Sequence, residues 1–300
     1  AAFVSAAREY VPPLIINTDL PLVDLPTYAG KETTFHASIA GAIIAASSGV
    51  AILMHGYESI PNRVGSGPVL AELGIPADLS PSQVALEVAS KGFGYLDVSL
   101  YHPPLARFLD LRKELGLRTF FHPVSRMLNP ARAKAQVIGM THPPYFEKTA
   151  EAARMLGTPR GLVVRGMEGE PELSIAGITK VIELQGDRIF PLSLQAKDLG
   201  LPAGGSSDMA GFAREQIGRE ADLLRKILRN EVRGGQRDWV LMNAAMLLYA
   251  SGKTPSISSA LPLVVRALES GAAAEKLAQV ATGITAVGSM AASVQDKKDQ

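Results

Sequence analysis

The chain has 300 residues, of which 47% are hydrophobic and 20% charged, with a formal net charge of +1 and no cysteine. This composition is that of a globular protein with a sizeable core, and the lack of cysteine excludes disulfides, thiolate metal sites and cysteine nucleophiles. The most apolar run, residues 37–54, is interrupted by glycine and serine, so it predicts a buried helix and strand rather than a membrane span. Because no secretory leader is visible, we expect a cytoplasmic protein without a membrane partner.

Helices and strands alternate along the first half of the chain. The apolar patterns predict, in order, a helix over residues 3–10, a proline-bounded linker over 12–21, a strand over 23–25, a helix over 37–47, a strand over 50–54, a helix over 82–90 and a strand over 93–98. Thr34 is expected to cap the second of these helices. Strand–helix–strand units of this kind strongly favour a right-handed parallel crossover.

The second half continues the alternation and ends in helices. The expected elements are a strand over 135–140, a helix over 145–156, a strand over 161–165, a hairpin of 179–184 and 188–192, a long amphipathic helix over 209–232, and helices over 238–249, 256–270 and 271–280. The hairpin should turn at Gly186-Asp187. The fold class is therefore α/β, with a mainly parallel sheet covered by helices on both faces.

Four loops are expected to meet at one edge of this sheet, because ligands of α/β proteins gather at the carboxyl ends of the strands. These loops are residues 26–34, 55–67, 101–103 and 166–172. The last of them carries Glu168, Glu170 and Glu172, which suit either a divalent ion on phosphates or a solvated acidic turn. Phosphate cradling by glycine-rich backbone is not indicated, since the first loop has one glycine beside bulky Tyr28.

Positive charge is concentrated in residues 101–139. Seven Lys and Arg side chains oppose two acidic ones in this stretch, on a chain whose total charge is only +1. Such a surplus is typical of a site for an anion, which could be a phosphate, a carboxylate or a nucleic acid. The alternative is a solvated helix face followed by a loop.

Several segments resemble anthranilate phosphoribosyltransferases. The resemblance runs from residue 23 to about 280 and is carried by Tyr101-His102-Pro103 and by residues 50–56, 65–74, 112–121, 128–134, 161–164 and 243–252. It implies a phosphoribosyltransferase domain of the nucleoside phosphorylase type, a small helical subdomain and a homodimer. We therefore expect residues 1–22 to be a remnant of the helical subdomain with its linker, largely missing at its amino-terminal side, and residues 23–300 to be the α/β domain.

The resemblance also implies functional residues. Those matching the family's acceptor-binding positions are His55, His102 and Arg118, those matching its donor phosphate-binding positions are Thr27, Thr34, Ser38 and Arg63, and Glu172 matches a Mg²⁺-binding position. The chain departs from the family at the phosphate loop, where residues 26–31 read Pro-Thr-Tyr-Ala-Gly-Lys instead of Gly-Thr-Gly-Gly-Asp-Gly. It therefore resembles a divergent paralogue without the usual glycine loop.

Two functions follow from this resemblance. The first is transfer of a phosphoribosyl group to a small aromatic acceptor, related to tryptophan biosynthesis, with the standard activity weakened or lost because each missing phosphate contact removes about 1.5–3 kcal/mol. The second is non-catalytic, sequence-independent binding of a nucleic-acid backbone, as implied by a divergent group of the same fold that binds nucleic acid. Its basic residues would be Arg107, Arg112, Lys113, Arg126, Arg132 and Lys134.

Overall fold

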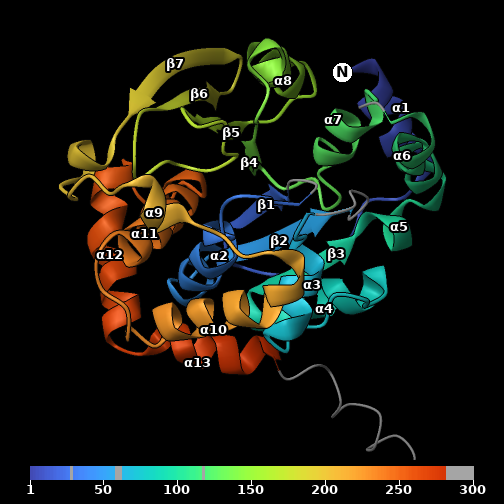
Figure 1. Ribbon diagram of the computed structural model, residues 1–300. Helices are drawn as coiled ribbons and strands as arrows, with labels where there is room; N and C mark the ends of the chain where they lie inside the picture. Colours follow the sequence, from blue (N-terminus) through green and yellow to red (C-terminus); the bar gives the residue numbers. More distant parts are fainter. Residues whose placement is uncertain (28–29, 58–62, 117–118, 282–300) are drawn as a thin grey trace, which may run out of the picture.

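The computed structural model describes residues 1–27, 30–57, 63–116 and 119–281, apart from the side chains of residues 112 and 113 (Figure 1). Its described part contains one seven-stranded sheet in the order β3-β2-β1-β4-β5-β6-β7. The strands are β1 (Leu22–Pro26), β2 (Ala51–Gly56), β3 (Phe93–Asp97), β4 (Ala135–Gly139), β5 (Arg160–Gly166), β6 (Thr179–Gln185) and β7 (Arg188–Leu194). Neighbours from β3 to β5 pair in parallel, and β6 and β7 pair antiparallel. The expected mainly parallel, mixed sheet is confirmed.

Helices cover both faces of this sheet (Figure 1). One face packs against a layer formed by α2 (Ala37–Ser47), α3 (Ser66–Glu72), α10 (Ile217–Leu228), α11 (Gly235–Ala250), α12 (Ile257–Glu269) and α13 (Ala272–Ala281). The other face packs against α1 (Ala2–Tyr10), α4 (Pro81–Lys91), α5 (Val98–Tyr101), α6 (Pro103–Leu115), α7 (Phe121–Arg126) and α8 (Pro143–Met155). Neighbouring strand residues enter opposite layers, as Val137 and Ile138 do, because side chains alternate across a pleated sheet.

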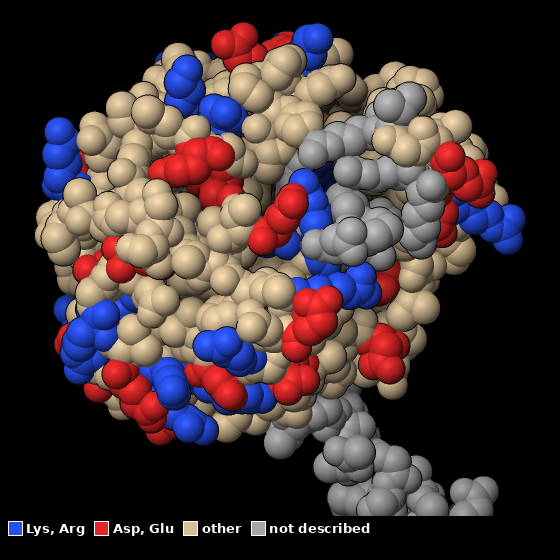
Figure 2. Space-filling view, in the orientation of Figure 1, with Lys and Arg blue, Asp and Glu red and all other residues tan. Residues whose placement is uncertain are grey.

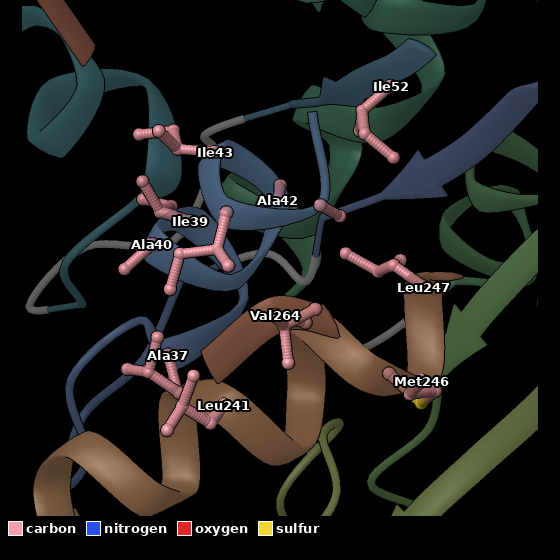
Figure 3. Close-up of a cluster of buried hydrophobic side chains, with 14 of the residues drawn as sticks. Ala37, Ile39, Ala40, Ala42, Ile43, Ile52, Leu241, Met246, Leu247 and Val264 are labelled. Carbon is pink, nitrogen blue, oxygen red and sulfur yellow. The ribbon is translucent and has the colours of Figure 1, made fainter. Parts of the chain in front are cut away.

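The centre of the larger core is the contact between α2 and α11. Ala37 and Leu241 are fully buried there and lie close together in Figure 3, whereas Ile39 and Ile43 are buried on another side of α2. A Cβ on Gly41 would lie only 3.1 Å from the backbone nitrogen of Ala244, so a glycine permits this close approach of the two helices. The helix and strand predicted from the apolar run 37–54 are confirmed as α2 and β2. Among the described residues, no helix is long and apolar enough to cross a membrane.

One helix prediction is wrong. Residues 209–232 do not form one long helix, because α10 begins at Ile217 and is preceded by a short helix α9 (Ser206–Met209) and a 3-10 turn η2 (Arg214–Gln216). The intervening chain crosses the loop before α2, where Gly211 N donates to Thr33 O (2.9 Å) and Phe35 N donates to Met209 O (3.2 Å). A Cβ on Gly211 would fall 2.4 Å from the backbone of Thr34, so this crossing requires glycine.

The amino-terminal segment is fastened to the loop that precedes β4. Arg8 on α1 donates to the carbonyls of Met127 and Leu128 (2.9 Å each), and Leu14 N donates to Pro130 O (2.9 Å). The segment before residue 22 is thus held against the basic stretch of the chain. The division of the chain at residue 22 stays a prediction.

Candidate functional site

The order of the strands reverses between β1 and β4, which is where α/β sheets bind ligands. Two small cavities lie at the carboxyl ends of β1, β2 and β4, of about 30 and 20 Å³. We name them after the roles that the resemblance implies for some of their residues: the donor cavity, lined by Thr27, Lys31, His36, Ser38, Ser66, Gly139 and Glu172, and the acceptor cavity, lined by Thr27, His55, Tyr57, His122, Ser125 and Arg126. Thr27 lines both. Each is about large enough for one or two waters.

Lys31 dominates the donor cavity. Its side chain is almost fully buried, and its ammonium lies 2.8 Å from Glu172 Oε2 and 3.6 Å from Glu170 Oε2. The same ammonium donates to Phe35 O (2.9 Å) and lies 5.0 Å from the centre of the Trp239 ring. The backbone of Lys31 is fixed by two hydrogen bonds to Val64, so the side chain is aimed inward. Sequence reasoning missed this residue, because a lysine in a polar loop usually points to solvent.

The amino-terminal end of α2 is occupied by carboxylates of the chain itself. Ser38 N donates to Glu172 Oε1 (3.1 Å), and His36 N donates to Glu220 Oε1 (2.7 Å), which also contacts His36 Nδ1 (2.6 Å). A helix amino terminus attracts anions through its free N–H groups and its dipole. Burial alone would raise the pKa of Glu220, but the His36 ring and its hydrogen bonds outweigh it, so the pKa lies below its usual value.

Hydrogen bonds from other segments hold Glu170, and the backbone next to Glu172, in place. Asn243 on α11 accepts a hydrogen bond from Leu173 N (3.0 Å), directly after Glu172. Thr34 Oγ1 donates to Glu170 Oε2 (2.8 Å) instead of capping α2, so the predicted cap is wrong. The resemblance assigned Thr34 and Ser38 to donor phosphates, whereas here both bind carboxylates.

The acceptor cavity contains a histidine held by an acid. His55 Nε2 lies 3.1 Å from Asp24 Oδ1, and Gln136 donates to Asp24 Oδ2 (2.7 Å). Within the described part of the chain, His55 Nδ1 and Thr27 Oγ1 are buried and have no hydrogen-bond partner. Since Nε2–H donates a hydrogen bond to Asp24 Oδ2 (3.4 Å), a neutral His55 presents Nδ1 as an acceptor. An aspartate in the middle of a buried strand is the sequence signal that could have revealed this pair.

Cationic and phenolic groups complete the acceptor cavity. Arg126 on α7 donates to Gly139 O (3.2 Å), at the carboxyl end of β4, so its guanidinium is drawn to the sheet edge. Burial raises the pKa of the Tyr57 phenol, and the carboxylate of Asp110 raises it further, so the phenol keeps its proton at neutral pH. Sequence reasoning placed Arg126 on a basic surface instead.

Of the three predicted acceptor residues, only His55 lines this cavity within the described part of the chain. The strand predicted over 93–98 ends at Asp97, and the short helix α5, capped by Asp97, lies between it and His102. His102 Nε2 lies 3.0 Å from Ala7 O and Nδ1 accepts from Leu105 N (3.2 Å), so both ring nitrogens bind backbone. Arg118 lies outside the described residues.

Among the described basic residues of 101–139, Arg126 and Arg132 turn toward backbone carbonyls of the protein itself. Arg132 donates to three backbone carbonyls, those of Leu128 (3.0 Å), Asn129 (3.4 Å) and Arg8 (3.1 Å). Arg107 and Lys134 are exposed, and the side chains of Arg112 and Lys113 are outside the described part. Arg63, predicted to bind phosphate, pairs with the exposed Glu32 (3.3 Å). Figure 2 shows Lys and Arg interspersed with Asp and Glu over the face it presents.

Glu172 does not fit the Mg²⁺ ion that the resemblance implies. Mg²⁺ needs about six oxygen ligands at roughly 2.0–2.1 Å, but the Lys31 ammonium already lies against Glu172 Oε2 and approaches Glu170. Among the residues that the structure describes, no group of three or more His, Asp or Glu side chains is arranged to hold a metal ion. The site therefore pairs its carboxylates with an internal cation.

A mainly parallel sheet with cavities where the strand order reverses defines an α/β protein whose site lies at the carboxyl ends of the strands. Residues 22–274 match the family model described as "Glycosyl transferase family, a/b domain", and the chain belongs to this family. It is 33% identical over 278 residues to the anthranilate phosphoribosyltransferase of Methanocorpusculum labreanum, covering 92% of this chain and 80% of that protein. The one from Rubrobacter xylanophilus is 34% identical over 268 residues, with 89% and 76% covered.

Solved structures agree with this assignment. The crystal structure of anthranilate phosphoribosyltransferase from Thermus thermophilus aligns with a TM-score of 0.81 at 34% identity, over 93% of this chain and 82% of that one. The Saccharomyces cerevisiae protein in complex with PRPP and Mg aligns with a TM-score of 0.79 at 22% identity, over 92% of this chain and 77% of that one, and shows the shared fold. The family resemblance seen in the sequence is confirmed.

Proposed function

We propose that this chain is a phosphoribosyltransferase-type protein that binds a phosphorylated sugar and a small aromatic acceptor on either side of Thr27, and that its reaction with the standard donor is weakened. Family membership supports the reaction class, because the similar proteins are named for transfer of a phosphoribosyl group to anthranilate. The observation that carries the proposal is the pair of buried polar atoms without a partner in the described chain, Thr27 Oγ1 and His55 Nδ1, both on side chains lining the acceptor cavity.

Transfer of this kind depends on positioning and on stabilising charge at the leaving group, since no protein nucleophile is needed. On the acceptor side, His55 Nδ1 accepts a hydrogen bond from the attacking amine, Asp24 holds the ring in the required tautomer, and Arg126 attracts an acceptor carboxylate. On the donor side, Thr27 Oγ1 and His36 Nε2 are buried without a partner in the described chain, while Thr34 and Ser38 N are committed to Glu170 and Glu172. Part of the donor side is therefore already taken up by groups of the chain itself.

The cheapest test is titration calorimetry with phosphoribosyl pyrophosphate in the presence of Mg²⁺, followed by an assay of product formation with anthranilate. We expect millimolar donor binding and a slow reaction that His55→Ala abolishes. His142→Ala is the matched control, because His142 lies outside both cavities and its ring nitrogen contacts Thr141. Absence of both heat and His55-dependent product at millimolar donor contradicts the proposal, and micromolar binding contradicts the claimed weakening.

Nucleic-acid binding receives less support from the same structure. The basic stretch directs Arg126 toward the acceptor cavity and Arg132 toward backbone carbonyls, so these two cations do not extend along a surface. A binder of phosphate backbones needs several cations free to replace counterions. The self-association implied by the resemblance stays a prediction, which mass measurement in native buffer checks.

A further inference from the structure

The donor cavity contains both an anion and a cation supplied by the chain itself. The anion is the carboxylate of Glu172, which accepts a hydrogen bond from Ser38 N in the first turn of α2 (3.1 Å). The cation is the ammonium of Lys31, 2.8 Å from the other oxygen of the same carboxylate. One carboxylate thus bridges a helix amino terminus and a buried ammonium, which is the arrangement a phosphate bound between a helix and a metal ion would have.

The surroundings of Lys31 are built for a buried ammonium. An ammonium has three donors, and those of Lys31 face Phe35 O (2.9 Å), Glu172 Oε2 (2.8 Å) and, at 3.6 Å, Glu170 Oε2. The Trp239 ring lies beneath it at 5.0 Å, which adds a favourable cation–π contact. Only about 5% of the Lys31 side chain is exposed, so its charge is compensated by protein groups rather than by water.

A divalent ion on Glu172 would have to displace this ammonium. A second positive charge on the same carboxylate pair would be repelled by the ammonium, because this repulsion is poorly screened in a buried site. The displaced side chain would also give up Phe35 O and the Trp239 ring. Binding of the metal would therefore require Lys31 to lose its contacts with Glu172, Phe35 O and the Trp239 ring.

We propose that Lys31 is the resident cation of the donor cavity, replacing a divalent metal on Glu170 and Glu172, so that this chain binds no Mg²⁺ there and any phosphorylated donor binds free of metal. This inference deepens the proposed function, on which it rests for the donor, but its test requires neither donor nor turnover. A latent metal position should appear when the positive charge is removed, because the two glutamates are already held by Thr34 and Ser38 N.

The test measures binding of Mn²⁺ alone by electron paramagnetic resonance. We expect no Glu172-dependent binding to the unaltered chain at millimolar Mn²⁺, and binding to Lys31→Met that is at least about tenfold tighter, because a positive charge beside the ion is gone. The double variant Lys31→Met with Glu172→Gln should bind no better than the unaltered chain. Lys197→Met, which removes an exposed lysine, is the matched control and should change nothing.

A second measurement uses only the unaltered chain, so the proposal can be tested even if the Lys31→Met variant misfolds. Reductive methylation followed by mass spectrometry should label Lys31 far more slowly than the exposed Lys197, and millimolar Mg²⁺ should not change the ratio. The proposal is overturned if Mg²⁺ accelerates labelling of Lys31, if the unaltered chain binds Mn²⁺ in a manner that Glu172→Gln abolishes, or if folded Lys31→Met gains no binding. Failure of the donor titration leaves each of these readouts intact, so the two proposals fail separately.

Discussion

The two cavities beside Thr27 differ in how their charged groups are paired. In the donor cavity, Glu172 is bound by Lys31 and by the first turn of α2, so its own charge is compensated within the protein, although His36 Nε2 lies buried without a partner in the described chain. In the acceptor cavity, His55 Nδ1 lies buried without a partner in the described chain, although Asp24 fixes the other ring nitrogen. Buried polar groups are normally satisfied, so an open ring nitrogen points to a ligand, whereas the bound carboxylate of Glu172 points to structure.

Under the proposed function, this contrast separates an acceptor side from a donor side whose groups are partly occupied by the chain itself. Neutralising a carboxylate with an internal ammonium stabilises the loop before α2, but it withdraws the groups that would hold a phosphate. The acceptor side retains an oriented histidine, a phenol and a guanidinium around a small space. We therefore propose that binding of a small aromatic acid persists while donor binding is weakened.

The largest expected effect comes from breaking the donor-side ion pair. Lys31→Met leaves Glu172 and Glu170 buried without their cation, and removing one partner of a buried pair costs about 3–5 kcal/mol. Urea unfolding measures this loss. Adding Glu172→Gln to Lys31→Met should recover part of it, because the uncompensated charge is then gone. A loss of less than about 1 kcal/mol, the scale of an exposed pair, would show that Lys31 is not essential to this region.

A smaller loss in the free energy of unfolding is expected from a change on the acceptor side. Asp24→Asn keeps the shape of the side chain but weakens its bonds to His55 and Gln136, and such changes at buried charged groups cost about 1–3 kcal/mol. The same substitution at the exposed Asp222, which pairs with Arg225 on one helix face, should cost no more than about 0.5 kcal/mol. Equal losses of stability in the two variants would mean that the Asp24–His55 pair contributes no more to stability than the exposed Asp222–Arg225 pair.

The alternation of strands and helices could be predicted from sequence because it depends on local patterns. The apolar run 37–54 contains both a helix and a strand of the observed core, and the hairpin of β6 and β7 turns where Gly186-Asp187 indicated. The helix expected over 209–232 failed for a non-local reason. Its first part is held by hydrogen bonds to residues 33 and 35, and the close approach at Gly211 is not visible in a periodicity.

The candidate site was harder to predict than the fold, since side chains choose partners that are distant in sequence. Lys31 pairs with Glu172 in the other half of the chain, and no local rule distinguishes it from a solvated loop lysine. His102 was assigned to the cleft, but one turn of helix capped by Asp97 carries it to the carbonyl of Ala7. Arg126 was assigned to a surface, yet its guanidinium binds Gly139 O. A count of charged residues in a segment does not show which way each side chain points.

The smallest expected effect concerns the exposed basic residues. Arg107 and Lys134 are the exposed cations of the described basic stretch, so replacing both by alanine should weaken any binding of a labelled oligonucleotide by no more than about tenfold at roughly 50 mM salt, and by less at roughly 200 mM. Fluorescence anisotropy with two unrelated sequences measures this, and the two should respond alike. Arg132→Ala should instead lower the free energy of unfolding, because its guanidinium ties together the carbonyls of Leu128 and Arg8. A large, salt-indifferent or sequence-selective loss in the double variant would establish a nucleic-acid surface that the contacts of Arg126 and Arg132 do not suggest.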